Sequence, residues 1–386
     1  MAVTLGSERL IASGALRGRR VGVVCNPASI DSAFGHIVDR IGAEPGALRA
    51  ILGPQHGFRS DVQDNMIETA HAHDAGRRVP VYSLYSETRE PTAAMLEGLD
   101  ALVIDLQDVG VRIYTYIYTM ANCLRACARQ GLRVIVCDRP NPVGGLAVEG
   151  PTLQRGYESF VGLFPIPMRH GLTIGELARL FNEQFALGAD LEVVAMEGWS
   201  REMYHDETGL PWVMPSPNIP TLDTATVYPG TVLVEGTLLS EGRGTTRPFE
   251  LVGAPWLHAE RLSGAMNARG LEGVYFRPAV FEPTFQKHAG KTCGGCQIHV
   301  LDRAAFSPCA AAAALLLECY RQDPADFEWR PPPYEYEHTK MPIDIQAGTP
   351  AFRQQIEGQI PLEDIVESWE PGLNEFEEMR GEFLLY

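Results

Sequence analysis

Short apolar runs alternate with amphipathic stretches through the first part of the chain. The runs rich in β-branched residues are the expected strands, and they lie at 21–25, 48–52, 79–84, 101–104 and 132–137. Between the last two runs, residues 116–129 carry apolar side chains at helical spacing. Strands that alternate with helices are typical of a parallel sheet with right-handed crossovers. The pattern therefore predicts an α/β fold that begins with a Rossmann-like domain over residues 1–145.

The pattern changes near residue 140. Pro and Gly are frequent from 140 to 167, which indicates an inter-domain crossing or an ordered loop at an active site. Thr173, followed by Glu176 three residues later, is typical of the start of a helix. We expect a second, smaller α/β or α+β domain over residues 146–386 that closes a cleft against the first. Its expected strands are 191–196, 231–234 and 297–300, and its expected helical segments are 310–320 and the acidic stretch 363–382.

Polar side chains gather where three of the expected strands end. The segments are Gly53 to Arg59, Asp105 to Tyr116 and Asp138 to Gly145. In open α/β sheets ligands bind outside the carboxyl ends of the strands, so these segments predict a site at one edge of the sheet. The sequence contains neither the Gly-x-Gly-x-x-Gly motif nor a phosphate loop, so it lacks the nucleotide fingerprints of such sheets and we expect no cofactor.

Charge and composition narrow the class of partner. The formal net charge of −17 opposes binding to nucleic acid and to anionic membrane surfaces, whereas a local arginine could still hold one carboxylate of a small sugar. The sequence contains no apolar run long enough for a membrane helix and no apolar signal core, so we expect a cytoplasmic protein. Most of the eight cysteines lie in expected strands and helices, which is typical of free thiols in a reducing compartment. The sequence does not set the oligomeric state.

The three strand-end segments, together with three later segments, resemble the DUF1343 family. The later segments are Met214 to Asn218, Tyr228 to Gly230 and Glu241 to Glu250, and the resemblance runs from Leu16 to Asp344. Characterised members of this family are exo-acting β-N-acetylmuramidases of the NamZ type. The resemblance implies a glycoside hydrolase that releases terminal β-N-acetylmuramic acid from the non-reducing end of peptidoglycan fragments. Its small-molecule substrate would be a muropeptide or a disaccharide that contains N-acetylmuramic acid.

One position departs from the family pattern. The family usually has Glu where this chain has Gln55, and Gln can hydrogen-bond a sugar but cannot donate a proton as a carboxylic acid does. Two alternatives therefore stay open: a non-catalytic or regulatory aminosugar-binding protein, and a hydrolase of a related aminosugar. The mechanism also stays open between a route that uses two carboxylates and one in which the acetamide oxygen of the substrate attacks the anomeric carbon.

Candidate catalytic residues follow from the needs of glycoside hydrolysis, which uses one carboxyl to protonate the leaving oxygen and usually a second at the anomeric centre. The carboxylates near or between the matched motifs are Glu68, Asp105, Asp108, Asp138, Glu149, Glu235 and Glu241. Glu68 is our candidate for the missing acid, because it lies on the same loop as Gln55 and burial or a neighbouring carboxylate could raise its pKa. Asp105 and Asp108 are the next candidates. His56 is a candidate for proton exchange near neutral pH.

Candidates for substrate binding carry amide, phenol, hydroxyl, carboxylate or guanidinium groups within the matched motifs. They are Gln55, Arg59, Arg112, Tyr116, Asn141, Asn218, Glu241, Arg243, Thr245 and Arg247. We expect an arginine of the segment 243–247, or Arg112, to hold the lactyl carboxylate of muramic acid through a bidentate pair.

Four other residues have nearly zinc-like spacing. They are His288, Cys293, Cys296 and His299. We nevertheless expect no metal, because the strand expected at 297–300 would turn neighbouring side chains to opposite faces.

Overall fold

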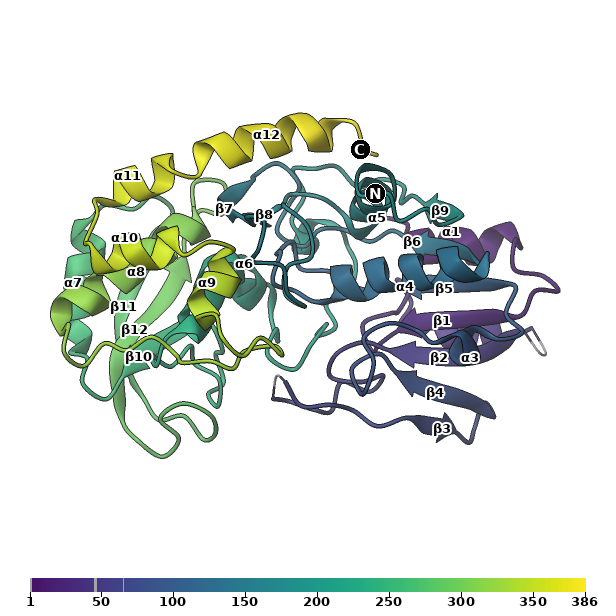
Figure 1. Ribbon diagram of the computed structural model, residues 1–386, viewed down its shortest axis with the longest axis horizontal. Coiled ribbons are helices and arrows are strands. Elements are labelled where there is room, and N and C mark those ends of the chain that lie inside the picture. Colours follow the sequence, from purple (N-terminus) through teal and green to yellow (C-terminus); the bar gives the residue numbers. More distant parts are fainter. Residues whose placement is uncertain (1, 45–46, 65) are drawn as a thin grey trace.

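A seven-stranded sheet forms the core of the first unit of the computed structural model, which describes residues 2–44, 47–64 and 66–386 (Figure 1). In spatial order its strands are β3 (Ala72–Asp74), β4 (Val79–Ser83), β2 (Leu48–Gly53), β1 (Val21–Cys25), β5 (Ala101–Asp105), β6 (Arg133–Cys137) and β9 (Leu191–Val194). β3 pairs antiparallel with β4, and the other neighbours are parallel. The predicted Rossmann-like sheet is confirmed.

Helices cover both faces of this sheet because its central strands are apolar on both sides. Every residue of β1 and β5 is buried, and alternate side chains point to opposite faces. One face packs against α4 (Tyr116–Gln130), α5 (Ile174–Gln184) and the short α3 (Ala93–Leu96). The other face packs against α1 (Gly6–Ser13) and α2 (Ile37–Gly42). Residues that follow the carboxyl ends of β4 and β5 contact later segments of the chain: the Tyr85 hydroxyl donates to Glu335, and the Tyr116 hydroxyl donates to the Pro215 carbonyl.

The second unit is built on a three-stranded antiparallel sheet. In spatial order its strands are β10 (Leu251–Ala254), β12 (Cys293–Val300) and β11 (Val274–Phe281). The other helices of the described residues are α6 (Leu222–Thr231), α7 (Ala259–Ala268), α8 (Pro308–Gln322), α9 (Pro342–Ala347), α10 (Ala351–Glu357), α11 (Leu362–Glu367) and α12 (Glu370–Gly381), with 3-10 turns η1 (His205–Glu207) and η2 (Val232–Gly236). A ladder of β7 (Glu149–Thr152) and β8 (Pro167–Arg169) lies between the two units (Figure 1). Within the described ranges, none of the helices is both long enough and apolar enough to cross a membrane.

The helical segments predicted for the second unit and the strand predicted at 297–300 are confirmed. They correspond to α8, to α11 with α12, and to β12. In the acidic C-terminal segment, Ile365 and Phe376 are buried while most of the charged side chains are exposed. The segment is therefore a pair of helices with one solvated face, as its apolar spacing indicates.

Two strand predictions are wrong in type or in place. Residues 231–234 are helical, at the junction of α6 and η2. This segment is buried on every side, so it lacks the amphipathic spacing that identifies a helix, and its β-branched residues suggested a strand. Residues 191–194 do form a strand, β9, but it pairs with β6 in the first sheet. A division of the chain at residue 145 would separate β9 and α5 from the sheet that they complete.

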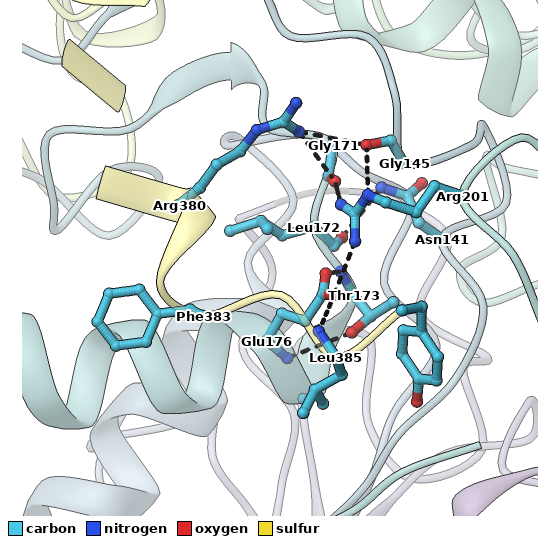
Figure 2. Close-up of polar contacts among 12 residues, drawn as sticks. Asn141, Gly145, Gly171, Leu172, Thr173, Glu176, Arg201, Arg380, Phe383 and Leu385 are labelled. Carbon is cyan, nitrogen blue, oxygen red and sulfur yellow. Dashed lines mark hydrogen bonds and ion pairs between the residues drawn. The ribbon is translucent and has the colours of Figure 1, made fainter. Parts of the chain in front are cut away.

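The C-terminal segment ties the two units together. After α12 the chain returns to the first unit and ends close to the N-terminus (Figure 1). Figure 2 shows the contacts around Glu176, whose carboxylate accepts the Leu385 N–H at 2.9 Å and pairs with Arg201 at 2.7 Å. Arg380 donates to the carbonyl oxygens of Gly145 and Gly171 at 3.2 and 3.3 Å. The predicted helix start is also confirmed, since the same Glu176 completes the capping box of α5.

Candidate active site

A cavity that is partly open to solvent lies where the two units meet. The first unit contributes residues after β2 and before α4, and the second contributes residues of α6, η2 and nearby loops. The lining residues are Gln55, His56, Ile113, Tyr114, Thr115, Tyr116, Val161, Ser216, Asn218, Ile219, Tyr228, Glu235, Arg243, Phe249, Tyr334 and Glu335. The carboxyl end of β2, where the sequence predicts a site, forms one wall of this cavity.

Gln55 and His56 reach the cavity through a tight turn after β2. The backbone is left-handed at His56 (φ 68°) and at Gly57 (φ 81°), a conformation that glycine adopts freely and that is strained for histidine. The Oε1 atom of Gln55 accepts a hydrogen bond of 2.7 Å from the Thr115 hydroxyl. The Gln55 side chain also hydrogen-bonds Glu335. Because Oε1 is engaged by Thr115, the amide nitrogen is the natural donor to Glu335.

His56 is a neutral hydrogen-bonding group at pH 7. Burial lowers the pKa of His56 to about 4. Its Nδ1 lies 2.7 Å from the carbonyl oxygen of Val62, which can only accept, so Nδ1 carries the proton and Nε2 is an acceptor. The proton exchange near neutral pH predicted for His56 is therefore wrong, and the side chain is suited to accepting a sugar hydroxyl.

Glu335 is a buried carboxyl from the loop between α8 and α9. Burial raises the pKa of Glu335 to about 7; the nearby Glu235 also raises it, whereas hydrogen bonds from Tyr85 and Gln55 oppose the shift. The Tyr85 hydroxyl donates to Oε2 of Glu335 at 2.9 Å. The backbone is left-handed at Glu335 (φ 44°) and at Tyr336 (φ 68°), which turns consecutive side chains toward different surroundings. A carboxyl with a pKa near 7 can hold a proton at neutral pH, as a general acid must.

Glu235, at the end of η2, is the second carboxylate of the cavity. Its Oε1 lies 2.5 Å from Nη2 and 3.2 Å from Nε of Arg243, and its Oε2 accepts the Tyr334 hydroxyl at 3.1 Å. Beneath it, Glu241 lies 3.3 Å from Arg243 and pairs with the buried Lys287 ammonium at 2.7 Å. This network of alternating charges orients Glu235 in the cavity, while Glu241 lies outside the cavity lining.

Aromatic rings form the remaining wall of the cavity. The ring centroids of Tyr114 and Tyr116 are 4.7 Å apart, those of Tyr114 and Tyr228 are 6.2 Å apart, and those of Tyr228 and Phe249 are 4.7 Å apart. The Tyr116 hydroxyl donates to the Pro215 carbonyl at 2.6 Å. Aromatic walls with a few convergent polar groups are typical of small-molecule sites.

Several residues predicted from the sequence meet in this cavity. They are Gln55, His56, Tyr116, Asn218 and Arg243. Asn218 donates to the Gln63 carbonyl at 2.8 Å, which joins the loop after β2 to the second unit.

The strand-end aspartates lie away from the cavity and are held by other groups. Asp105 forms a bidentate pair with Arg139, at 2.6 and 2.9 Å. Asp108 accepts the Gly110 N–H at 2.7 Å and lies 3.3 Å from Nε2 of His170. Both are buried, and neither lines the cavity. Their contacts fix the loops that follow β5 and β6.

Arg112 and Asn141 are parts of the core between the units. Arg112 is fully buried and donates to the Gln346 carbonyl at 2.8 Å, and burial lowers the pKa of Arg112 to about 10. Asn141 donates to the Leu172 carbonyl at 3.0 Å (Figure 2). Arg112 is therefore not placed to hold a substrate carboxylate in this cavity.

Four other predicted residues lie outside the cavity lining, at or near the surface. Glu68 has a side chain that is 52% exposed and pairs with Arg89 at 3.3 Å, so it is not the buried carboxyl that the sequence predicted as the acid. Arg59 is exposed, and Arg247 is 46% exposed and pairs with Glu250 at 3.2 Å. The Thr245 hydroxyl donates to the Gly242 carbonyl at 2.6 Å and stabilises its own turn.

Sequence reasoning missed Glu335 and gave Glu235 no particular weight among the carboxylates. Glu335 belongs to the run Tyr334 to Glu337, in which aromatic and acidic residues alternate after three prolines. That alternation is the signal that could have drawn attention to it, because it is unusual in a loop. The zinc-like residues do not converge: in the part of the chain that the structure describes, no three His, Cys, Asp or Glu side chains form a metal-binding group.

Comparison with known proteins identifies the family of the whole chain. The family description "Exo-beta-N-acetylmuramidase NamZ, N-terminal" matches residues 21–223, and the corresponding C-terminal description matches residues 226–386. The chain is 45% identical over 372 residues to the peptidoglycan beta-N-acetylmuramidase NamZ of Bacillus subtilis, covering 96% of this chain and 88% of that protein.

Two crystal structures of DUF1343 family proteins from Bacteroides fragilis share the whole fold. One is 34% identical with a TM-score of 0.90, and the other is 28% identical with a TM-score of 0.76. Each alignment covers 100% of this chain and 99% of the other. The chain therefore belongs to the NamZ family of exo-β-N-acetylmuramidases, also known as DUF1343.

Proposed function

We propose that this protein hydrolyses the β-glycosidic bond of a terminal N-acetylmuramic acid in peptidoglycan fragments, with Glu335 as the general acid. The observation that carries the proposal is a buried carboxyl with a pKa of about 7 beside an arginine-paired carboxylate in one cavity. Two carboxylates in different surroundings are the usual equipment of a glycoside hydrolase. The name of the Bacillus subtilis relative supports the substrate class.

Glu335 protonates the departing oxygen as the bond between that oxygen and the anomeric carbon breaks. The leaving sugar departs as a neutral alcohol, and Glu335 becomes a carboxylate that the Tyr85 and Gln55 hydrogen bonds stabilise. Water then supplies hydroxide to the anomeric carbon, and its proton returns to a carboxylate of the cavity. Atoms and charge balance without a metal or a redox partner.

Glu235 stabilises the positive charge that develops at the anomeric carbon. Both of its oxygens are engaged, one by Arg243 and the other by the Tyr334 hydroxyl, so its orientation is fixed before substrate arrives. A carboxylate held in this way is suited to orienting the substrate's acetamide or a water molecule. Its two strong partners make it a weaker nucleophile than a carboxylate without them.

Gln55 does not deprive the cavity of an acid, because Glu335 supplies one. The amide keeps a hydrogen bond to Glu335 without adding a second titrating carboxyl beside it. This arrangement argues against a protein that binds the sugar and has lost proton donation.

The test uses a disaccharide of N-acetylmuramic acid linked to N-acetylglucosamine. The wild-type protein should release free N-acetylmuramic acid, detected by chromatography, and Glu335→Gln should reduce kcat by roughly two to four orders of magnitude. Glu318→Gln is the matched control, because Glu318 is also a largely buried, arginine-paired glutamate but lies in α8 at 2.5 Å from Arg269. Its turnover should equal that of the wild type.

Three results would redirect the proposal. Tight sugar binding by the wild type without turnover would support the aminosugar-binding alternative. Equal turnover of a muramide and the matching glucosaminide would assign a related aminosugar as substrate. Full activity of Glu335→Gln would place the acid elsewhere in the cavity. Proton NMR of the first anomer released would show whether the configuration is retained or inverted.

A further inference from the structure

The cations in and beneath the cavity are already bonded to protein groups. Arg243 pairs with Glu235, Lys287 pairs with Glu241, and the core residue Arg112 donates to backbone carbonyls. A substrate carboxylate could take over the Lys287 ammonium, or the Nε and Nη2 donors of Arg243, only by displacing a buried carboxylate, which would be left without its partner. A cation near the cavity whose present partner is an exposed carboxylate is easier for a substrate carboxylate to reach.

Arg89 lies outside the cavity lining, but close enough to Glu335 that its positive charge opposes the rise in the pKa of that carboxyl. Its guanidinium carbon is 4.3 Å from the ring centroid of Tyr85 and 4.2 Å from that of Tyr336. Tyr85 is the residue whose hydroxyl donates to Glu335, and Tyr336 follows Glu335 in the chain. The same two tyrosines thus border both the proposed acid and the Arg89 guanidinium.

The Arg89 side chain is held in place before any ligand arrives. It lies between two aromatic faces, donates to the Ser86 carbonyl through Nη1, and is only 17% exposed. Cation–π contacts and a hydrogen bond to the backbone together restrict its rotamers. A bound carboxylate would therefore find an ordered guanidinium and would lose little affinity to side-chain ordering.

The carboxylate now paired with Arg89 is easy to replace. Glu68 lies 3.3 Å from Nη2 of Arg89, and its side chain is 52% exposed. The Tyr336 hydroxyl donates to the same Glu68 oxygen at 3.1 Å. Exposed ion pairs of this kind change equilibria by no more than roughly fivefold, because water competes for both partners. Glu68 therefore marks where a carboxylate can sit and does little to prevent another from taking its place.

We propose that Arg89 binds a carboxylate of the substrate in the position that Glu68 occupies. This inference rests on the proposed function and adds the residue that selects for an acidic substrate. The carboxylate belongs either to the lactyl group of the terminal sugar or to a peptide attached to the fragment. Both sources present the same planar group to the guanidinium, and bidentate pairing suits either.

The experiment compares Arg89→Met with the wild type on nitrophenyl β-N-acetylmuramide and on its neutral lactyl methyl amide. For the acid, the variant should raise KM by at least roughly fivefold, and by more where the bound sugar shields the pair from water. Because Arg89 also acts on the pKa of Glu335 whichever substrate is bound, the ratio of the KM values for acid and amide is the readout. For the amide, wild type and variant should have similar KM values. Arg89→Lys should recover part of the affinity.

Glu68→Gln tests the other half of the inference. Removing the competing carboxylate should lower KM for the acid by roughly two- to fivefold and leave kcat unchanged. Arg303→Met is the matched control, since Arg303 also pairs with an exposed carboxylate, Asp206 at 2.8 Å, and lies 5.3 Å from the ring centroid of Tyr204. Its kinetics should match those of the wild type.

The outcomes separate the two proposals. If Arg89→Met raises KM equally for the acid and the amide, Arg89 has only a structural role and the inference fails. A large drop in kcat for Glu68→Gln would also overturn the inference. A third substrate, the same muramide with a peptide acid joined to the lactyl group by an amide bond, distinguishes the two sources: if Arg89→Met raises KM only for this substrate, the peptide supplies the carboxylate. If the wild type hydrolyses none of these substrates, the proposed function fails, and calorimetric binding of N-acetylmuramic acid to wild type and Arg89→Met then decides the role of Arg89.

Discussion

Asp138 and Glu335 are both buried carboxyls whose pKa burial raises to about 7, yet they stand in different surroundings. Asp138, at the end of β6, accepts hydrogen bonds of 2.8 Å from the Thr173 hydroxyl, the Gly175 N–H and the Tyr386 hydroxyl. It caps α5 and anchors the C-terminus, and it does not line the cavity. Glu335 accepts hydrogen bonds from the side chains of Tyr85 and Gln55 and faces the cavity.

The comparison shows that a raised pKa by itself indicates only that a carboxyl is buried. Catalysis also requires that the carboxyl can reach a substrate. Asp138 directs its acceptor oxygens at neighbouring protein donors, so a proton there would serve only the fold. Glu335 instead lines the cavity, as does the second carboxylate, Glu235. Asp138 and Glu335 therefore differ mainly in access to the cavity, and variants of the two residues test the effect of that difference.

The largest expected effect separates their roles in turnover. Glu335→Gln should reduce kcat on a natural disaccharide by roughly two to four orders of magnitude, and much less on a nitrophenyl glycoside, whose leaving group departs without protonation. Asp138→Asn should keep kcat within about threefold of the wild type on both substrates. Steady-state kinetics on the two substrates measure this, and a leaving-group dependence in Asp138→Asn would contradict the comparison.

The next effect concerns a strand-end aspartate that is purely structural. Asp105→Ala removes one partner of the buried pair with Arg139 and leaves an uncompensated guanidinium, so the free energy of unfolding should fall by about 3 to 5 kcal/mol. Urea unfolding measures the loss. The double variant Asp105→Ala with Arg139→Met should recover part of it. A variant with normal stability and no turnover would instead place Asp105 in the chemistry.

Stability should also depend on pH through both carboxyls. Because the pKa values of Asp138 and Glu335 are raised above their ordinary values, they contribute stability that is complete below pH 4 and is lost as pH rises through about 7. For Glu335, the difference between 4.5 and about 7 corresponds to roughly 3 kcal/mol. Unfolding free energies at pH 5 and pH 8 should therefore differ less in Glu335→Gln than in the wild type. Turnover should fall over the same upper range, as Glu335 loses its proton.

The smallest expected effect concerns the structural role of Asp138. Tyr386→Phe removes the hydroxyl that donates to Asp138 at 2.8 Å and accepts the Met196 N–H at 2.6 Å, which should lower the free energy of unfolding by about 1 to 2 kcal/mol. The loss should be greater at pH 8 than at pH 5, because the hydroxyl stabilises the ionised form of Asp138. Denaturation at the two pH values measures this, while kcat should not change.

The first sheet and its site edge could be predicted because their signals are local. The strands of the first unit are short apolar runs between helices, and Gln55 and Tyr116 lie where such runs place ligand-binding groups. The segment 231–234 could not be assigned correctly, because a helix buried on all sides has no polar face to reveal its period. The sequence predicts the edge strand β9 as a strand, but its apolar pattern does not indicate which sheet it joins.

The proposed acid, Glu335, and the proposed substrate-binding arginine, Arg89, could not be predicted in the same way, because contacts between distant segments create their surroundings. Tyr85 and Glu335, which share a hydrogen bond, are 250 residues apart in sequence. Glu68 is on the expected loop, yet it lies in solvent, and the side chain that gains the burial belongs to the other unit. A pKa depends on solvent exclusion and on nearby charge, and neither is encoded by the neighbours of a residue in the chain.

The sequence by itself determined the parallel sheet, the edge of that sheet at which the cavity lies, the absence of nucleotide motifs and the family. Those properties follow from hydrophobic period, turn residues and ordered motifs, which are local in the chain. Only the tertiary structure decided which carboxyl is buried in the cavity, which are used up in ion pairs, and which arginine keeps an exchangeable partner. These are properties of three-dimensional packing, because burial and charge pairing arise when the two units close on one another.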